Sequence, residues 1–229
     1  MAELKAIPIV ALDYGAAAEA LTLVRALGDT CGFYKVGSEL FTAAGPAVIR
    51  AIREMGHEVF LDLKFHDIPN TVAGAVRSAV ETGATMLTVH ASGGSAMLKA
   101  AVAAAGSCRV MGVTVLTSFT ASGLGEAWGR DVSEIGSEVA RLAGLCAAAG
   151  AHGLVCSGHE LSVVRSAAPG LRPLVPGIRF ADGATHDQAR VMTPEAAAGS
   201  GAAYLVIGRM VTGAPDPVSA MRRVNAALG

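Results

Sequence analysis

The chain has 229 residues, of which 52% are hydrophobic and 16% are charged, with a net charge of −1. This hydrophobic content can fill a sizeable core and excludes a disordered chain. Because the net charge is close to zero and no basic run occurs, we do not expect the protein to bind nucleic acid. No unbroken apolar stretch of about 18 residues is present to cross a membrane, and no signal-peptide core follows Met1. With four scattered cysteines and no CxxC pair, we expect a cytoplasmic protein with reduced thiols.

Short apolar runs alternate with longer helical patterns along the chain. We predict strands at Ile7–Leu12, Phe33–Val36, Val59–Leu63, Met86–His90, Met111–Leu116, Gly153–Cys156, Pro173–Val175 and Tyr204–Ile207. We predict helices at Ala16–Leu27, Pro46–Met55, Thr71–Thr82, Ala96–Ala105, Val132–Ala149, Glu160–Ser166, Pro194–Ser200 and Pro217–Leu228. Thr71 is the expected cap of the third helix, and Asp216 with Pro217 the expected start of the last.

Eight β/α units in one chain predict a (β/α)8 barrel, a TIM barrel that forms a single domain over residues 1–229. A doubly wound parallel sheet is the alternative, but the count of eight favours closure. No linker, repeat or low-complexity segment divides the chain. In a barrel of this kind the functional residues lie at the C-terminal ends of the strands and in the loops that follow.

The third strand carries charged residues where a buried strand should be apolar. Because side chains two residues apart point to the same face, Asp62 and Lys64 share one face and Leu61 shares the other with Leu63. Asp67 follows shortly after. Buried charges are costly unless they pair or serve chemistry, so this group is either a structural ion pair or part of a functional site.

Every other predicted strand also ends in a polar residue or a glycine-containing turn. These strand ends deliver Asp13, Lys35, His90, Thr117 with Ser118, Ser157, Pro176–Arg179, and Gly208 with Arg209. Taken alone, His90 would be read as a hydrogen-bonded structural histidine and Ser157 as a helix N-cap. Taken together, the eight strand ends predict one polar site at a single end of the barrel.

A phosphate site is expected after the last two strands. Gly208 lets backbone N–H groups approach an anion, and Arg209 can bind it in bidentate fashion. The segment Arg179–Thr193 is a candidate lid over a bound substrate. The sequence has no P-loop, no GxGxxG dinucleotide fingerprint and no GxSxG nucleophile elbow.

With these residues in place, the chain resembles the orotidine 5′-phosphate decarboxylase family in its bacterial type, from Val10 to about Pro217. The matching blocks are Ala11–Asp13, Lys35–Gly37, Asp62–Thr71, Val89–Gly94, Thr114–Ser118, Val155–Ser157, Pro176–Arg179 and Ile207–Arg209. The third block is the most specific: its DxKxxD core is shared with sugar-phosphate enzymes of the same superfamily, and its extension through Ile68–Thr71 favours the decarboxylase.

The resemblance implies a cofactor-free and metal-free enzyme that converts orotidine 5′-phosphate to UMP and CO2 in pyrimidine biosynthesis. It implies that Lys64 is the proton donor, that Asp62 and Lys35 are its charged partners, and that Asp67 enters the site of the other subunit of a homodimer. The substrate contacts it implies are, for the ribose, Asp13, Lys35 and Thr71; for the pyrimidine, Thr117 and Ser157; for the phosphate, Gln188, Gly208, Arg209 and the adjacent Arg179; and, for no particular part of the substrate, Asp62, Ile68, His90 and Pro176.

Two other functions fit the same fold. A sugar-phosphate aldolase or decarboxylase of the same superfamily would use Asp62 and its neighbours to hold Mg²⁺. A catalytically silent phosphate-binding barrel would act as a sensor or scaffold. The Thr117-Ser118 and Pro176–Arg179 blocks argue against the first, and the intact Asp-Lys-Asp set argues against the second. Fold alone excludes neither.

Overall fold

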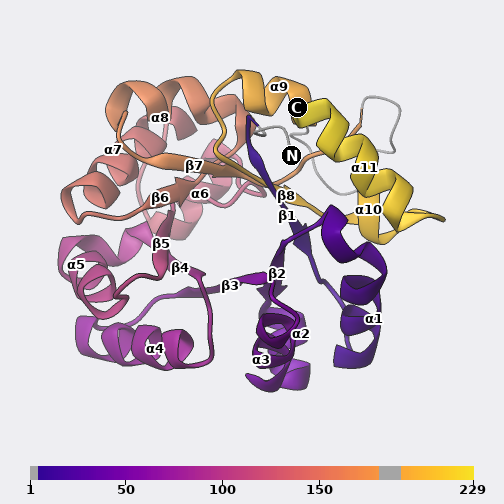
Figure 1. Cartoon of the computed structure of the whole chain (residues 1–229). Coiled ribbons are helices and arrows are strands. Elements are labelled where there is room, and N and C mark those ends of the chain that lie inside the picture. The colour runs from indigo at the N-terminus through magenta and orange to yellow at the C-terminus, as the bar shows by residue number, and fades with distance from the viewer. Residues whose placement is uncertain (1–4, 181–191) are drawn as a thin grey trace.

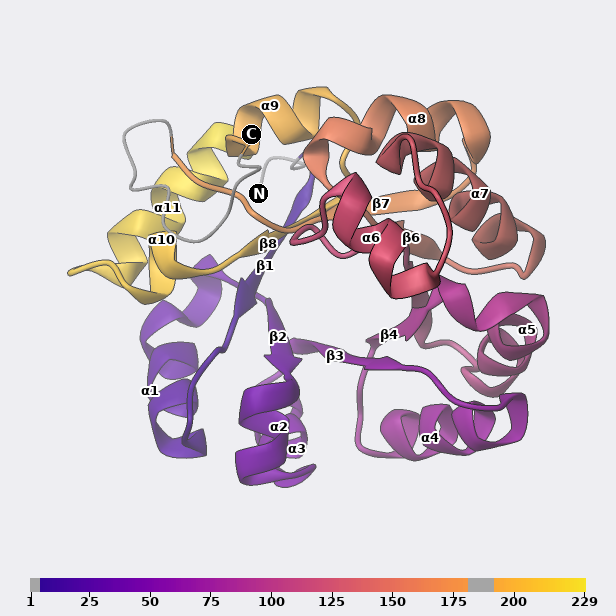
Figure 2. The ribbon, with the colours of Figure 1, turned by 180° about the vertical axis from the view of Figure 1, so that it is seen from behind.

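The computed structural model describes residues 5–180 and 192–229. Its eight parallel strands close into a barrel in sequence order, so the predicted TIM barrel is confirmed and the doubly wound sheet is excluded. Helices surround the barrel, as the two opposite views in Figures 1 and 2 show. Among the described residues, none of the helices combines the length and the apolar character needed to cross a bilayer.

The strands are β1 Ile7–Ala11, β2 Phe33–Gly37, β3 Glu58–Phe65, β4 Met86–His90, β5 Arg109–Val113, β6 Gly153–Val155, β7 Arg172–Val175 and β8 Tyr204–Ile207. The helices are α1 Ala17–Leu27, α2 Ser38–Ala44, α3 Ala47–Glu54, α4 Pro69–Glu81, α5 Gly94–Ala104, α6 Ala121–Trp128, α7 Ile135–Ala148, α8 Leu161–Ala167, α9 Pro194–Gly199, α10 Arg209–Thr212 and α11 Pro217–Leu228. Short 3₁₀ turns lie at Gly28–Thr30, Ala91–Gly93 and Gly158–Glu160.

Several predicted boundaries are wrong. The helix α4 begins at Pro69, whose fixed φ suits the first helical position, so Thr71 lies inside the first turn and does not cap it. Helices α2, α6 and α10 were not predicted. Asp216 is confirmed as a cap, because its carboxylate accepts a hydrogen bond of 3.0 Å from the backbone N–H of Ser219.

The core has two layers, one between barrel and helices and one inside the barrel. Seven buried side chains fill the barrel interior: Ile9, Phe33, Phe60, Met86, Met111, Leu174 and Tyr204. These seven side chains come from every strand except β6, whose Val155 packs against them while only partly buried. Apolar side chains on both faces are expected for a parallel sheet covered on its outer face. This inner layer separates the two ends of the barrel.

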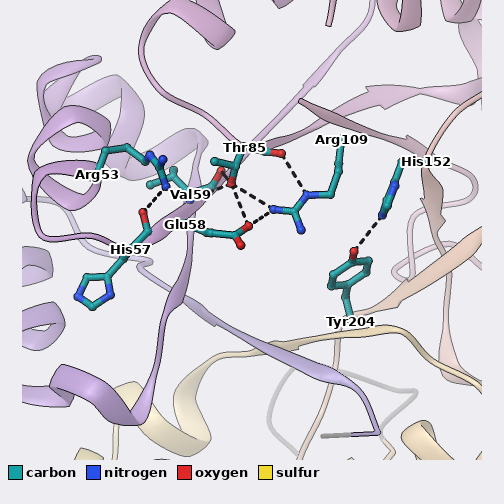
Figure 3. Close-up of polar contacts among 8 residues, drawn as sticks. All are labelled: Arg53, His57, Glu58, Val59, Thr85, Arg109, His152 and Tyr204. Carbon is teal, nitrogen blue, oxygen red and sulfur yellow. Dashed lines mark hydrogen bonds and ion pairs between the residues drawn. The ribbon is translucent and has the colours of Figure 1, made fainter. Parts of the chain in front are cut away.

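A polar network closes the N-terminal end of the barrel (Figure 3). The Arg109 guanidinium donates to the Glu58 carboxylate and, at 3.2 Å, to the carbonyl of Thr85, and it lies over the ring of Phe33. Beside it, the His152 ring nitrogen and the Tyr204 hydroxyl are 2.9 Å apart. We assign a structural role to this network, because in a TIM barrel the N-terminal end contributes stability and the C-terminal end carries the functional residues.

Candidate active site

A cavity of about 290 Å³ opens among the C-terminal ends of the strands. Its floor is apolar, with Phe60, Leu174 and Val206 among its lining residues. Its walls contain nine of the site residues predicted from the sequence: Asp13, Lys35, Asp62, Lys64, Thr117, Pro176, Arg179, Gly208 and Arg209. The structure thus brings these nine residues, which follow different strands, together at one cavity.

Asp62 and Lys64 form the charged centre of the cavity. The Lys64 ammonium lies 2.9 Å and 3.0 Å from the two carboxylate oxygens of Asp62. The two side chains are 35% and 15% exposed, so both are partly withdrawn from water. The two side chains meet as expected, but the strand alternation from which this was predicted is broken between them. Lys64 has a left-handed backbone with φ 53°, within an irregular part of the β3–β4 pairing.

A second ion pair joins β1 to β2. The Lys35 ammonium donates to the Asp13 carboxylate at 2.9 Å, and the lysine is buried while the aspartate is largely exposed. Gly37 makes room for this pair, since a Cβ there would lie 2.9 Å from the Lys35 nitrogen. The pair adds a fixed cation and a solvent-facing carboxylate to the cavity wall. Such an arrangement can orient hydroxyl groups of a bound sugar.

The ends of β7 and β8 bring two arginines to the same cavity. Arg179 is buried, and its guanidinium donates to its neighbouring backbone carbonyl at Ile178 over 2.8 Å. Arg209 is exposed and follows Gly208 directly. Two guanidinium groups beside a glycine backbone can bind a phosphate dianion. Gln188 and most of the predicted lid, Arg179–Thr193, lie in residues 181–191, outside the described part of the chain.

Four predicted residues near strands three and four do not line the cavity. Asp67 and Thr71 are exposed, and the Asp67 carboxylate accepts from the backbone N–H of Ile68 at 2.6 Å. Ile68 itself is 67% exposed, which is unusual for a large apolar side chain. His90 ends β4 with its ring 5.4 Å from that of His66. Burial lowers the pKa of His90, and the nearby His66 and Lys64 side chains lower it further.

Ser157 is not among the residues that line the cavity, and it forms the helix cap that the alternative interpretation expects. Its hydroxyl accepts from the backbone N–H of His159 at 3.4 Å, and its own N–H donates to the Glu160 carboxylate at 2.8 Å. This is a capping box at the start of a 3₁₀ turn. The pattern Ser-x-x-Glu signals it in the sequence.

Sequence reasoning missed Thr88. It is a fully buried residue of β4, and its hydroxyl contacts Asp62. The available signal was a lone polar residue inside the apolar run Met86–Val89. The apolar floor was also missed, because hydrophobic residues in a barrel strand look alike whether they fill the core or line a cavity.

Comparison with known proteins agrees with this geometry. The family model described as "Orotidine 5'-phosphate decarboxylase / HUMPS family" matches residues 7–224. A relative from Anaeromyxobacter sp. (strain K), named orotidine 5′-phosphate decarboxylase, is 51% identical over 95% of this chain and 96% of its own. One from Dichelobacter nodosus with the same name is 48% identical over 96% of this chain and 97% of its own.

Solved structures give the same result. The crystal structure of orotidine 5′-phosphate decarboxylase from Lactobacillus acidophilus superimposes with a TM-score of 0.86 at 33% identity, covering 98% of this chain and 99% of the other. An uncharacterised conserved protein from Geobacillus kaustophilus gives a TM-score of 0.84 at 34% identity, covering 97% and 100%. The model match and these relatives each extend over nearly the whole barrel, so the chain belongs to the orotidine 5′-phosphate decarboxylase / HUMPS family.

Proposed function

We propose that this barrel decarboxylates orotidine 5′-phosphate to UMP and CO2, with Lys64 as the group that stabilises and then protonates the reacting carbon. The relatives named for this activity support the reaction. The observation that carries the mechanism is the Lys64 ammonium held 2.9 Å from Asp62 inside a partly closed cavity. The activity makes the protein a carboxy-lyase of pyrimidine biosynthesis.

Decarboxylation of orotidine 5′-phosphate requires a positive charge beside C6 of the pyrimidine. Loss of CO2 breaks the bond between the orotate ring and its carboxylate and leaves the electron pair on C6 of the pyrimidine. A preorganised ammonium lowers the energy of that carbanion, and one of its protons then forms the new C–H bond. Asp62 fixes the direction of the Lys64 ammonium, because both of its carboxylate oxygens accept from that group. The negative charge of Asp62 would also lie near the substrate carboxylate, and loss of CO2 would relieve that repulsion.

The rest of the cavity would hold the nucleotide. We assign the ribose to Asp13 and Lys35 with Thr71, the pyrimidine to Thr117 and Ser157, and the phosphate to Gln188, Gly208, Arg209 and Arg179. Binding the phosphate far from the reacting carbon provides energy that can be realised in the transition state. Six of these assignments are supported by position, because the residues line the cavity. They are Asp13, Lys35, Thr117, Arg179, Gly208 and Arg209.

The first test is the reaction itself in the absence of metal. Purified protein, treated exhaustively with a chelator, is expected to consume orotidine 5′-phosphate at the untreated rate, as followed by the loss of orotate absorbance. The physical reason is that the Lys64 ammonium supplies the positive charge that a metal would otherwise provide. Activity that disappears on chelation and returns with Mg²⁺ would instead favour the aldolase-like alternative.

Arg209→Ala is expected to lower kcat/KM for orotidine 5′-phosphate by roughly tenfold to a hundredfold, because a charge-assisted hydrogen bond to the phosphate is lost. The same variant should hardly change the reaction of orotidine, which lacks the phosphate. Steady-state kinetics on both substrates measure the difference. Arg25→Ala, at an exposed position of α1, is the matched control and should leave both substrates unaffected. Equal losses on both substrates would place Arg209 away from the phosphate.

We also propose a homodimer with composite sites, in which Asp67 completes the partner's cavity. Two features support this: Asp67 faces solvent in its own subunit, and the adjacent Ile68 exposes an apolar side chain that an interface would cover. A cytoplasmic location is proposed as well. Its support is that all four cysteines, Cys31, Cys108, Cys146 and Cys156, are buried free thiols.

A further inference from the structure

The strand that carries Lys64 is irregular at one place. Leu61 of β3 pairs with Leu87 of β4, and the next pair along is Phe65 with Val89. Residues 62–64 of β3 therefore stand opposite a single residue of β4, Thr88. A bulge of this kind re-aims side chains, and here it allows Asp62 and Lys64 to meet.

The bulge places Lys64 in a backbone conformation that is costly for a residue with a Cβ. Its φ is 53°, and it is the one described non-glycine residue with a positive φ. Such a conformation persists only where the surroundings determine it. The Lys64 backbone N–H, displaced from the regular ladder, donates to the Thr88 hydroxyl at 2.9 Å.

The same hydroxyl also fixes the carboxylate. Thr88 donates its single proton to Asp62 Oδ1 at 3.0 Å, and this oxygen also accepts from the Lys64 ammonium at 2.9 Å. A threonine hydroxyl has one proton to donate and lone pairs to accept with, so both bonds can exist together. Thr88 is completely buried and is not part of the cavity wall.

We propose that Thr88 is a positioning residue for the reaction, one that sets the direction of the Lys64 ammonium by holding the Lys64 backbone and the Asp62 carboxylate with one hydroxyl. It acts through these two residues and touches no substrate. This inference rests on the proposed function for its effect on turnover, whereas its structural part, the geometry of the Asp62–Lys64 pair, can be measured without any substrate.

Thr88→Val tests the hydroxyl, because valine has the same shape but can neither donate nor accept. We expect kcat for orotidine 5′-phosphate to fall by roughly tenfold or more, since small displacements of a reacting group have large effects on rate. KM and the Kd of UMP should change by less than about threefold, because the cavity wall is intact. Thr88→Ser keeps the hydroxyl and should restore kcat to within about threefold of the wild type.

Thr85→Val is the matched control. Thr85 precedes the same strand, and its hydroxyl donates to the carbonyl of Val59 in β3 at 3.1 Å (Figure 3). Val59 lies near the N-terminal end of β3, away from the cavity. This variant should lower the unfolding temperature while leaving kcat and KM unchanged. A kcat loss in Thr88→Val that is matched by Thr85→Val at equal loss of stability would show a merely structural role and overturn the proposal.

The remaining outcomes are equally decisive. A Thr88→Val kcat within about threefold of the wild type, a loss in KM alone, or an equal loss in Thr88→Ser each contradicts the positioning role. If Thr88→Val does not fold, Thr88→Ala replaces it under the same criteria. If the wild type does not decarboxylate orotidine 5′-phosphate, the proposed function fails. The positioning role is then judged by a crystal structure of Thr88→Val. The Lys64 ammonium is expected to lie beyond hydrogen-bond distance of the Asp62 carboxylate, and an unchanged Asp62–Lys64 contact refutes the role.

Discussion

Lys64→Ala is expected to remove nearly all turnover while the barrel remains folded. The substitution deletes both the cation next to the carbanion and the acid that protonates it. Loss of one preorganised electrostatic group commonly lowers rates by about 10²–10³, and loss of a general acid by about 10²–10⁴. Because the two roles belong to one side chain, the expected loss is at the upper end of these ranges or beyond.

The measurement is single-turnover decarboxylation with enzyme in excess, together with circular dichroism and an unfolding temperature to establish the fold. Lys99→Ala is the matched control, since Lys99 is an exposed lysine of α5 and lies outside the cavity. A folded Lys64→Ala protein with a rate within about tenfold of the wild type would be incompatible with the mechanism proposed here.

The second large effect concerns the dimer. Lys64→Ala and Asp67→Ala homodimers should each be almost inactive. In a mixed dimer, one site receives both substitutions and the other receives neither, because each site takes its lysine from one subunit and Asp67 from the partner. Random reassociation makes about half of the dimers mixed, each with one intact site of two, so about a quarter of wild-type activity should return.

The control for this experiment is a mixture of Lys64→Ala with the double variant Lys64→Ala/Asp67→Ala. No combination of these subunits contains an intact site, so mixing should recover no activity. Subunit exchange is verified separately, for example with two affinity tags. If exchange occurs and the first mixture also stays inactive, Asp67 serves its own subunit, and the composite site is rejected.

The sequence was sufficient for the barrel because its signals are local and repeated. Each strand is a short apolar run and each long helix has its own periodicity, so eight alternations could be counted without any knowledge of contacts. Helices α2 and α10 escaped because they are short and begin close to a strand end: α2 starts directly after Gly37 of β2, and only Gly208 separates α10 from β8. Thr71 was misplaced because Pro69 already provides the helix start.

The site was predictable to the extent that strand ends determine it. Asp13, Lys35, Asp62 and Arg209 were found because parallel strands of a barrel all deliver their last residues to one end. The bulge opposite Thr88 was not predictable, because register between neighbouring strands is a tertiary property with no local signal. The place of Asp67 cannot be derived from one chain if its role belongs to a neighbour.

In the described part of the chain, the apolar layer beneath the cavity leaves it open only at the C-terminal end of the barrel. Phe60 and Leu174 belong both to the cavity floor and to the packed layer that fills the interior below it. Within the described residues, the route through the barrel axis is therefore plugged, and molecules come and go at the C-terminal end. In the proposed reaction, CO2 released beside Lys64 must pass the bound nucleotide or wait for it to leave. Product release through that opening, as well as the chemical step, can then limit kcat.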